Sequence, residues 1–422
     1  MNVLGIPILT ALIALPIVGG LVVALLPKSA EGQAKHVAFL VALAEFALSL
    51  PLWFRYKPAG PPFQFVEQVP WIEGLGASWH LGLDGLSMVL VLLTTALTAI
   101  SVLASYTAIQ TRVRPYYMML LLLEGAMIGT FLALDVLVFY VFWEAMLVPM
   151  YLLIGVWGGQ DRIRAAVKFF LYTMVGSVLM LVAILWLYFL YHAQNGVYTT
   201  DLLELYRTNV PLGVQTWMFA FNATGWSGSI LQMLNHGVST GALFLLVGVI
   251  YERRHTRLIS EFGGLWKVIP AFSVVFLVVM LSSIALPGTN GFVGEFLVLL
   301  GAFRTQQLWA VLAATGVILS AAYMLWMFQR VVFGPVTNSE NATLRDLTRR
   351  EVLVFAPLLV LIFWMGLFPN PILSRLAPTI DRQLAQIETR RMHLREVEAR
   401  MRMSQAGVEP CCPEHGAAMV KK

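Results

Sequence analysis

Long apolar runs alternate with short polar segments along most of the 422-residue chain. Because an α-helix rises about 1.5 Å per residue, about 20 apolar residues cross a bilayer core of roughly 30 Å. Runs of this kind predict ten membrane-spanning helices, at Val3–Leu26, Val37–Phe54, Leu83–Tyr106, Pro115–Leu134, Val136–Trp157, Ala166–Tyr191, Ile230–Tyr251, Ile269–Leu300, Leu308–Phe328 and Val352–Phe368. The predicted fold is therefore an all-α, polytopic transmembrane helix bundle of about ten spans.

The same pattern divides the chain into two parts. The predicted transmembrane domain covers residues 1–370, with longer outer loops at residues 55–81 and 192–229. Residues 371–422 are rich in Arg, Glu and Gln, which predicts a charged helical tail followed by a disordered end. The end contains Cys411 and Cys412, which lie too close together in a polar segment to indicate a disulfide framework or a convincing metal site.

Composition and charge predict that the chain lies in a membrane and which way its helices are oriented across it. Hydrophobic residues make up 59% of the chain and mean hydropathy is +0.76, which excludes a soluble domain. The net charge of +5 does not indicate a nucleic-acid partner, because one set of alternate loops holds fifteen Lys and Arg residues and the other only four. Cytoplasmic loops carry such an excess, so both termini are predicted outside. The first run lacks the marks of a cleaved signal peptide, and we predict that it is retained.

Five ionisable residues fall at membrane depth: Glu45, Glu124, Glu144, His236 and Glu295. A charge there costs at least about 3 kcal/mol, so such residues usually find a partner and mark a proton or ion path. Each also has a structural interpretation, namely a neutral side chain that hydrogen-bonds a neighbouring helix. Glu144 lies alone among about twenty uncharged residues and is favoured as functional, whereas Glu45 is far from other polar groups and is interpreted as structural.

The remaining three differ in their surroundings. Glu124 shares its span with small residues that allow close helix packing, and both interpretations stay open for it. His236 lies among amide and hydroxyl side chains and is either a relay group or a hydrogen-bonded structural histidine. Glu295 follows the segment Pro287-Gly288-Thr289-Asn290-Gly291, which predicts a broken helix at mid-membrane, a feature that recurs at transport sites.

Lys168 begins the sixth predicted span. It is interpreted first as a lysine whose amino group reaches the cytoplasmic surface, and alternatively as a partner of Glu144. The sequence contains no phosphate-binding loop, no clustered metal ligands within a span and no nucleophile beside a base. No catalytic residue, metal or nucleic-acid contact is therefore predicted.

Several motifs together resemble the M-type antiporter-like subunit of proton-pumping NADH:quinone oxidoreductase, respiratory complex I. They are the segments His80–Ser87, Phe142–Tyr151, Lys168–Thr173, Gln232–Gly237, Tyr251–Arg257, Gly263–Trp266 and Leu286–Phe296. They occur in the family's order through most of the chain. The sister antiporter-like subunits typically carry a lysine where Glu295 stands, so the glutamate favours the M type.

The resemblance implies a membrane subunit that conducts protons across a bacterial plasma membrane, or an equivalent energy-coupling inner membrane, driven by quinone reduction elsewhere in the complex. It implies proton-translocating roles for Glu144, Glu295 and His236, with Glu124 and Lys168 as further candidates. Flavin, iron–sulfur clusters and quinone are expected in other subunits and not in this chain. The implied partners are the other membrane subunits, including the sister antiporter-like subunits, and the lipid bilayer.

One departure from the family pattern is large. Residues 210–217 resemble the approach to the family's seventh helix, and residues 219–225 resemble the exit from its tenth. About four central helices are thus predicted to be absent, and with them the lysine that pairs with the fifth-helix glutamate. Every Lys of this chain lies in a loop, at a span end or in the tail, so we expect Glu144 to stay protonated.

Two alternatives remain open. The chain could belong to a multisubunit cation/proton antiporter or a membrane-bound hydrogenase, which the segments Tyr251–Arg257 and Pro287–Glu295 argue against. It could instead be a non-conducting structural subunit that has lost its lysine relay, which the missing lysines favour.

Overall fold

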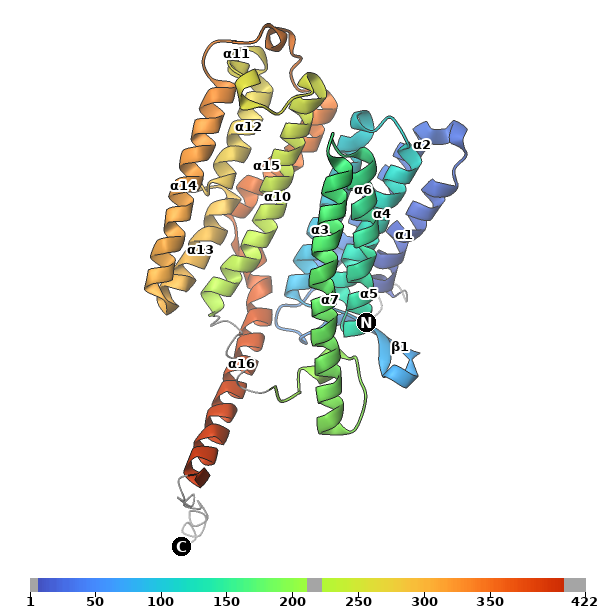
Figure 1. Cartoon of the computed structure of the whole chain (residues 1–422), viewed down its shortest axis with the longest axis vertical. Coiled ribbons are helices and arrows are strands. Elements are labelled where there is room, and N and C mark those ends of the chain that lie inside the picture. The colour runs from blue at the N-terminus through green and yellow to red at the C-terminus, as the bar shows by residue number, and fades with distance from the viewer. Residues whose placement is uncertain (1–6, 211–221, 406–422) are drawn as a thin grey trace.

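The computed structural model of the chain describes residues 7–210 and 222–405. Within these residues, nine helices are long and apolar enough to cross a membrane, and the tenth predicted span is a broken pair of shorter helices. The predicted transmembrane helix bundle is confirmed (Figure 1). The predicted junction at residues 211–221 and the predicted disordered end at residues 406–422 lie outside the described part of the chain.

The first half of the bundle is built from helices that follow one another through short turns, except between α2 and α3. They are α1 (Ile8–Leu25), α2 (Glu31–Arg55), α3 (Gly85–Ala108), α4 (Val113–Leu132), α5 (Val136–Ala145), α6 (Leu147–Trp157) and α7 (Arg162–Asn195). Small residues bring α1 and α4 together: a Cβ atom on Gly125 would lie 2.6 Å from the Ile17 side chain. The tight α1–α4 contact fixes the first half as a unit.

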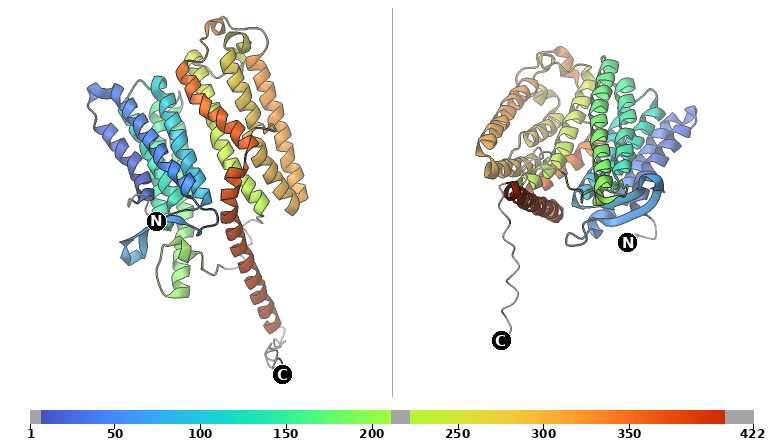
Figure 2. Two further views of the ribbon diagram at one scale, coloured as in Figure 1. Left: turned by 180° about the vertical axis from the view of Figure 1, so that it is seen from behind. Right: turned by 60° about the horizontal axis from the view of Figure 1, so that its bottom comes forward.

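The second half packs beside the first. Its helices are α10 (Ala223–Arg254), α11 (Leu265–Val268), α12 (Pro270–Ser283), α13 (Asn290–Thr305), α14 (Gln307–Val332) and α15 (Arg349–Leu367). Between the halves, α3 contacts α10, α15 and the last helix, α16 (Asn370–Gln405) (Figures 1 and 2). Ile372, Leu376 and Ile380 of α16 are buried in the same core, so the first turns of the charged tail belong to the bundle, while the rest extends away from it.

A β-hairpin occupies the segment between α2 and α3. Strand β1 (Gln64–Ile72) pairs antiparallel with β2 (Ala77–Leu83), and the turn includes Gly76 at φ 64°. The carboxylate of Glu67 accepts hydrogen bonds from the backbone N–H groups of Leu9 (2.8 Å) and Thr10 (2.9 Å), which caps the start of α1. The sequence analysis expected only a loop here, because four prolines obscure the short strand pattern.

The opposite end of the bundle is rich in basic residues. Arg253 of α10 donates to Glu351 of α15 at 2.9 Å, and both side chains are largely buried. Arg254 forms an ion pair with Glu340 and donates to Asn341 at 2.8 Å. The motif Tyr251–Arg257 thus ties α10 to the connection between α14 and α15.

Candidate functional site

The broken helix lies where the sequence predicts it. Between α12 and α13 the backbone enters the left-handed region at Ala285 (φ 58°) and at Gly288 (φ 93°), on either side of Pro287. At Gly291, a Cβ atom would lie 2.2 Å from the carbonyl oxygen of Ser282, so a side chain there would push the two half-helices apart. The glycine allows α13 to start directly against the end of α12.

A buried polar network fills the break. The Ser282 hydroxyl donates to Oδ1 of Asn290 at 2.5 Å, and it also lies 2.7 Å from the hydroxyl of Ser239 on α10. Nδ2 of Asn235, also on α10, donates to the backbone carbonyl of Asn290 at 2.7 Å. All four side chains are buried, so their hydrogen bonds hold the end of α12 and the start of α13 against the middle of α10.

The network continues to Glu295. Nδ2 of Asn235 donates to Oε1 of Gln232 at 3.2 Å, and Nε2 of Gln232 donates to Oε1 of Glu295 at 3.2 Å. Glu295 then borders a cavity of about 290 Å³ between α10, α13 and α14, lined also by Val298 and Ser320. A chain of hydrogen-bonding groups therefore runs from the helix break to a carboxylate at an open, partly polar cavity.

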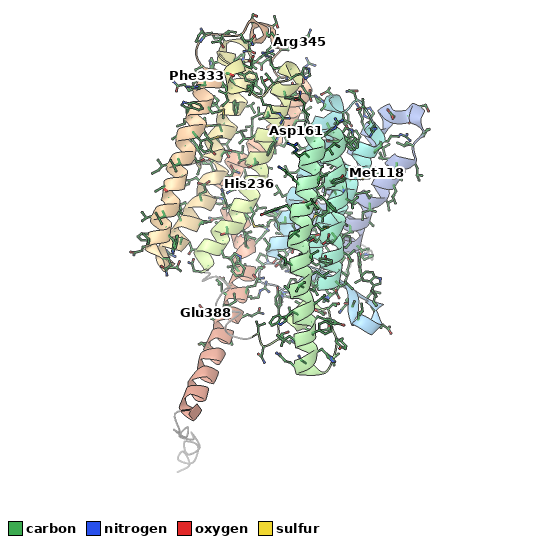
Figure 3. All side chains as sticks on the ribbon, in the orientation of Figure 1. Met118, Asp161, His236, Phe333, Arg345 and Glu388 are labelled. Atoms are coloured by element: carbon green, nitrogen blue, oxygen red, sulfur yellow. The ribbon has the colours of Figure 1, made fainter. Side chains whose placement is uncertain are left out.

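His236 stands apart from this chain. It is exposed on α10, and the hydrogen bond recorded for its ring is to the Thr240 hydroxyl, 3.0 Å from Nδ1 (Figure 3). One residue turns a helix by about 100°, so His236 does not share the inward face of its neighbour Asn235. The described contacts join Asn235, and not His236, to the break.

Glu144 lies next to an interruption of its own span. Pro149 has no N–H, so the carbonyl of Ala145 loses its helical partner, and the helix is divided at Met146 into α5 and α6. The Tyr140 hydroxyl interacts with Glu144 and with Ser177 of α7. The Oε1 atom of Glu144 is buried and has no hydrogen-bond partner among the described residues.

Lys168 forms no ion pair with Glu144 among the described residues. Its side chain is exposed near the start of α7, and the ion pairs of the described residues include none between the two. The rings of Tyr151 and Phe170 are in contact at 5.6 Å, which sets the alignment of α6 and α7. That alignment places Lys168 about 13 Å along the helix axis from the level of Glu144. Lys168 is thus exposed and distant from Glu144, and its role stays a prediction.

Two further carboxylates are buried inside the first half of the bundle. Glu45 on α2 and Glu124 on α4 are both fully buried, and Glu45 lies within electrostatic range of Glu124. The expectation that Glu45 is remote from other polar groups is wrong, because α2 packs directly on α4. Separation along the chain gave no sign of this contact.

The sequence analysis missed the residues that carry the polar chain, above all Gln232, Asn290 and Ser282. The i, i+4 spacing of Asn235 and Ser239 was a usable signal, because it places both on one face of a helix. In residues 7–210 and 222–405, no group of three or more His, Cys, Asp or Glu side chains is placed to hold a metal ion.

Comparison with known proteins decides the family. The chain is 35% identical to NADH-quinone oxidoreductase subunit M of Rhodobacter capsulatus, with 88% of this chain and 95% of that protein covered. It is 34% identical to NADH-ubiquinone oxidoreductase chain 4 of Marchantia polymorpha, over 87% of this chain and 94% of that protein. The chain belongs to the M-subunit family of NADH:quinone oxidoreductases. The family model described as NADH:quinone oxidoreductase/Mrp antiporter, transmembrane, matches residues 133–221 and 211–320.

Solved structures agree with this membership. A chain of respiratory complex I from Thermus thermophilus matches with TM-score 0.74 and 27% identity, over 89% of this chain and 99% of that chain. A chain of the Mrp complex from Dietzia sp. (TM-score 0.67, 16% identity, 97% of this chain and 58% of that chain) shares the fold. The membrane-bound sulfane sulfur reductase, an archaeal respiratory membrane complex, also does (TM-score 0.69, 15% identity, 86% of this chain and 77% of that chain).

The alignment also measures what this M-family chain lacks. It spans 491 positions against the Rhodobacter protein, although 88% of 422 residues is only about 371, so about 120 positions of that relative face no residue here. The two matches to the family model meet at residues 211–221, where the sequence analysis places the missing helices. A stretch of about 120 residues has room for four spans of about 20 residues with their loops.

Proposed function

We propose that this chain is a proton-translocating membrane subunit of a complex I type NADH:quinone oxidoreductase, with Glu295 as its principal protonatable station. The observation that carries the proposal is the hydrogen-bond chain from the broken helix through Asn235 and Gln232 to Glu295. A carboxylate that receives hydrogen bonds from an ordered chain and borders an open cavity can take up and pass on a proton without a large rearrangement.

Glu144 is proposed as the second station, with Tyr140 as its neighbour. It lacks a cationic partner among the described residues, so no lysine in that part of the chain is placed to control its proton transfer. His236 is proposed as a peripheral group that exchanges protons on the exposed face of α10, and Glu124 as an accessory site. Lys168 is assigned to the membrane surface and only to local charge balance.

The exposed faces of the bundle support a place within a larger complex. Large apolar side chains along α7 and α14 are exposed, and His236 is an ionisable group exposed at membrane depth. Partner membrane subunits, including sister antiporter-like subunits, would cover such polar groups, while lipid covers the apolar surface. Flavin, iron–sulfur clusters and quinone are assigned to other subunits, and the complex to a bacterial plasma membrane or an equivalent inner membrane, with both termini outside.

A second function has two observations in its favour. The missing segment and the unpaired Oε1 of Glu144 favour a structural subunit that fills its place in the assembly without conducting protons. The two functions predict different rates of proton uptake when Glu295 or Glu144 is replaced by the neutral glutamine.

The test is NADH-driven proton uptake in membrane vesicles where this chain is the sole M-type subunit. Glu295→Gln and Glu144→Gln are compared with Glu73→Gln, an exposed glutamate in the hairpin turn that serves as control. We expect both intramembrane variants to lower proton uptake or coupled NADH oxidation, with assembly and the control unchanged. Unchanged uptake in both variants would establish the structural function, and purification without flavin and iron–sulfur subunits would favour an antiporter assembly.

A further inference from the structure

A second group of buried polar side chains lies between α2, α3 and α4. Glu45 and Ser49 of α2, Thr95 and Thr98 of α3 and Glu124 of α4 are all buried, the two glutamates completely. They share continuous helix faces with apolar residues, because Glu45 and Ser49 are one turn apart, as are Thr95 and Thr98. Three helices thus contribute to one enclosed polar cluster.

The two carboxyl groups are left without hydrogen-bond partners. All four of their oxygen atoms are buried and unpartnered within the described part of the chain. The hydroxyls of Ser49 and Thr95 lie 3.0 Å apart and contact the carbonyls of Phe46 (2.7 Å) and Leu92 (3.2 Å), so they are already occupied. Glu124 lies within electrostatic range of the Glu45 carboxyl and near the Thr98 hydroxyl, and neither group forms a hydrogen bond of ordinary geometry with it.

Among the described residues of the surrounding helices, no Lys or Arg faces the pair. In the segment from α1 to α4 the Lys and Arg residues lie at helix ends or in loops, at positions 28, 35, 55, 57, 112 and 114, and the two histidines lie near the start of α2 (His36) and in β2 (His80). The helix α1 contains no ionisable side chain. Two buried carboxylates within electrostatic range of each other, with no cation placed to neutralise them, disfavour the state in which both are ionised. The chemistry of the pocket selects a proton as its ligand.

This cluster is separate from Glu144. A Cβ atom on Gly129 of α4 would lie 2.5 Å from the Phe142 ring of α5, so that side of α4 faces α5. Glu124 is five residues earlier, which is about 140° around the helix. Gly125 faces Ile17 of α1 instead. The Glu45–Glu124 side of α4 therefore points away from the helix that carries Glu144.

We propose that Glu45 and Glu124 form a proton-binding carboxyl pair. Both are protonated at rest, and the pair releases one proton at a time. In that step one O–H bond breaks, its electron pair stays on the carboxylate oxygen, and the proton passes to water. The proposal does not depend on proton conduction through Glu144 or Glu295.

Hydroxyl groups lie between the carboxyl pair and the basic end of the bundle. Tyr117 lies two turns from Glu124 on the same face of α4, and its hydroxyl is buried without a recorded partner. Beyond it, the Tyr116 and Ser105 hydroxyls lie 2.9 Å apart. Ser105 lines a cavity of about 140 Å³ together with Arg350. Water in this cavity is the acceptor we assign to the released proton.

Infrared spectroscopy of the purified assembled complex tests the pair directly. A protonated carboxyl group has a carbonyl band that an ionised carboxylate lacks. We expect wild type to retain such bands at neutral pH, and Glu45→Gln and Glu124→Gln each to remove one of them. The bands should shift in heavy water, because the proton is exchangeable. Glu388→Gln, an exposed glutamate on α16, is the control and should remove none.

A second variant keeps the test valid if the glutamine variants fail to fold. Thr98→Val keeps the side-chain size and both glutamates, and we expect it to shift the Glu124 band without removing it. If neither Gln variant removes a band, the pair is ionised or holds a metal cation, and the proposal is wrong. Bands that appear only after sodium is removed would identify that cation, and bands that never shift in heavy water would show a sealed structural pair.

Discussion

The side-chain amide of Gln232 on α10 donates a 3.2 Å hydrogen bond to Glu295, the carboxylate that follows the helix break. The same amide group accepts from Asn235, so Gln232 is the link between the polar network and the cavity. Because of Gln232, Glu295 is the last group of a hydrogen-bond chain and not an isolated carboxylate at membrane depth.

Replacing this link should slow proton transfer. Gln232→Leu keeps approximate side-chain volume but removes both hydrogen bonds. Because one such bond is worth about 1 kcal/mol, we predict that NADH-driven proton uptake falls about fivefold. The control is Gln329→Leu, an exposed position on α14. Equal rates in the two variants would show that the chain from the break to Glu295 carries no protons.

The break itself should depend on Ser282 and not on the serine beside it. Ser282→Ala leaves the buried Asn290 and Ser239 with lost partners, so we predict a loss of about 1–3 kcal/mol in the free energy of unfolding. The neighbour Ser283 donates only to the Val279 carbonyl of its own helix, and Ser283→Ala should cost less than about 1 kcal/mol. Denaturation of the detergent-solubilised protein measures both, and similar losses would contradict the network.

The close packing of α10 against α13 leaves no room for a side chain at Gly228. A Cβ atom there would lie 2.6 Å from the backbone nitrogen of Val298, so Gly228→Ala should destabilise the protein by about 1–3 kcal/mol. Gly241 is on the same helix with nothing within 4 Å of its Cβ position, and Gly241→Ala should be neutral or slightly stabilising. Thermal unfolding of the two variants compares them, and the reverse order would disprove this packing.

A pH-dependent contact secures the hairpin. Asp201, before the short helix α8 (Leu202–Leu205), lies 3.0 Å from Nδ1 of His80 and accepts from the Leu203 N–H at 2.8 Å. Burial by itself would raise the pKa of Asp201, but these hydrogen bonds hold it below its ordinary value. The ionised carboxylate therefore stabilises the fold above the ordinary pKa of about 3.9, and this contribution is lost as pH falls through the lowered value.

We predict that Asp201→Asn is less stable than wild type near neutral pH and loses less stability on acidification. Unfolding of the solubilised protein between about pH 7 and about pH 3 measures the difference. Asp161→Asn, at an exposed aspartate, should follow the wild-type curve. Parallel curves for wild type and Asp201→Asn would show that this carboxylate makes no pH-dependent contribution.

The sequence by itself determined the spans, the broken helix and the family. Apolar runs of about twenty residues need no partner to be recognised, and Pro287 with Gly288 and Gly291 interrupts a helix through local backbone chemistry alone. Seven motifs together, including the one around Glu295, were sufficient to predict the M-subunit family, which the relatives confirm.

Only the tertiary structure decided which polar groups meet. Gln232 and Glu295 are 63 residues apart, and Glu45 and Glu124 are 79 apart. The hydrogen bond of the first pair and the electrostatic proximity of the second therefore follow from helix packing and not from local pattern. Side chains on one face of a helix contact only the helix that packs against that face. Asn235 faces the break and joins the network, whereas the adjacent His236 lies on another face and does not.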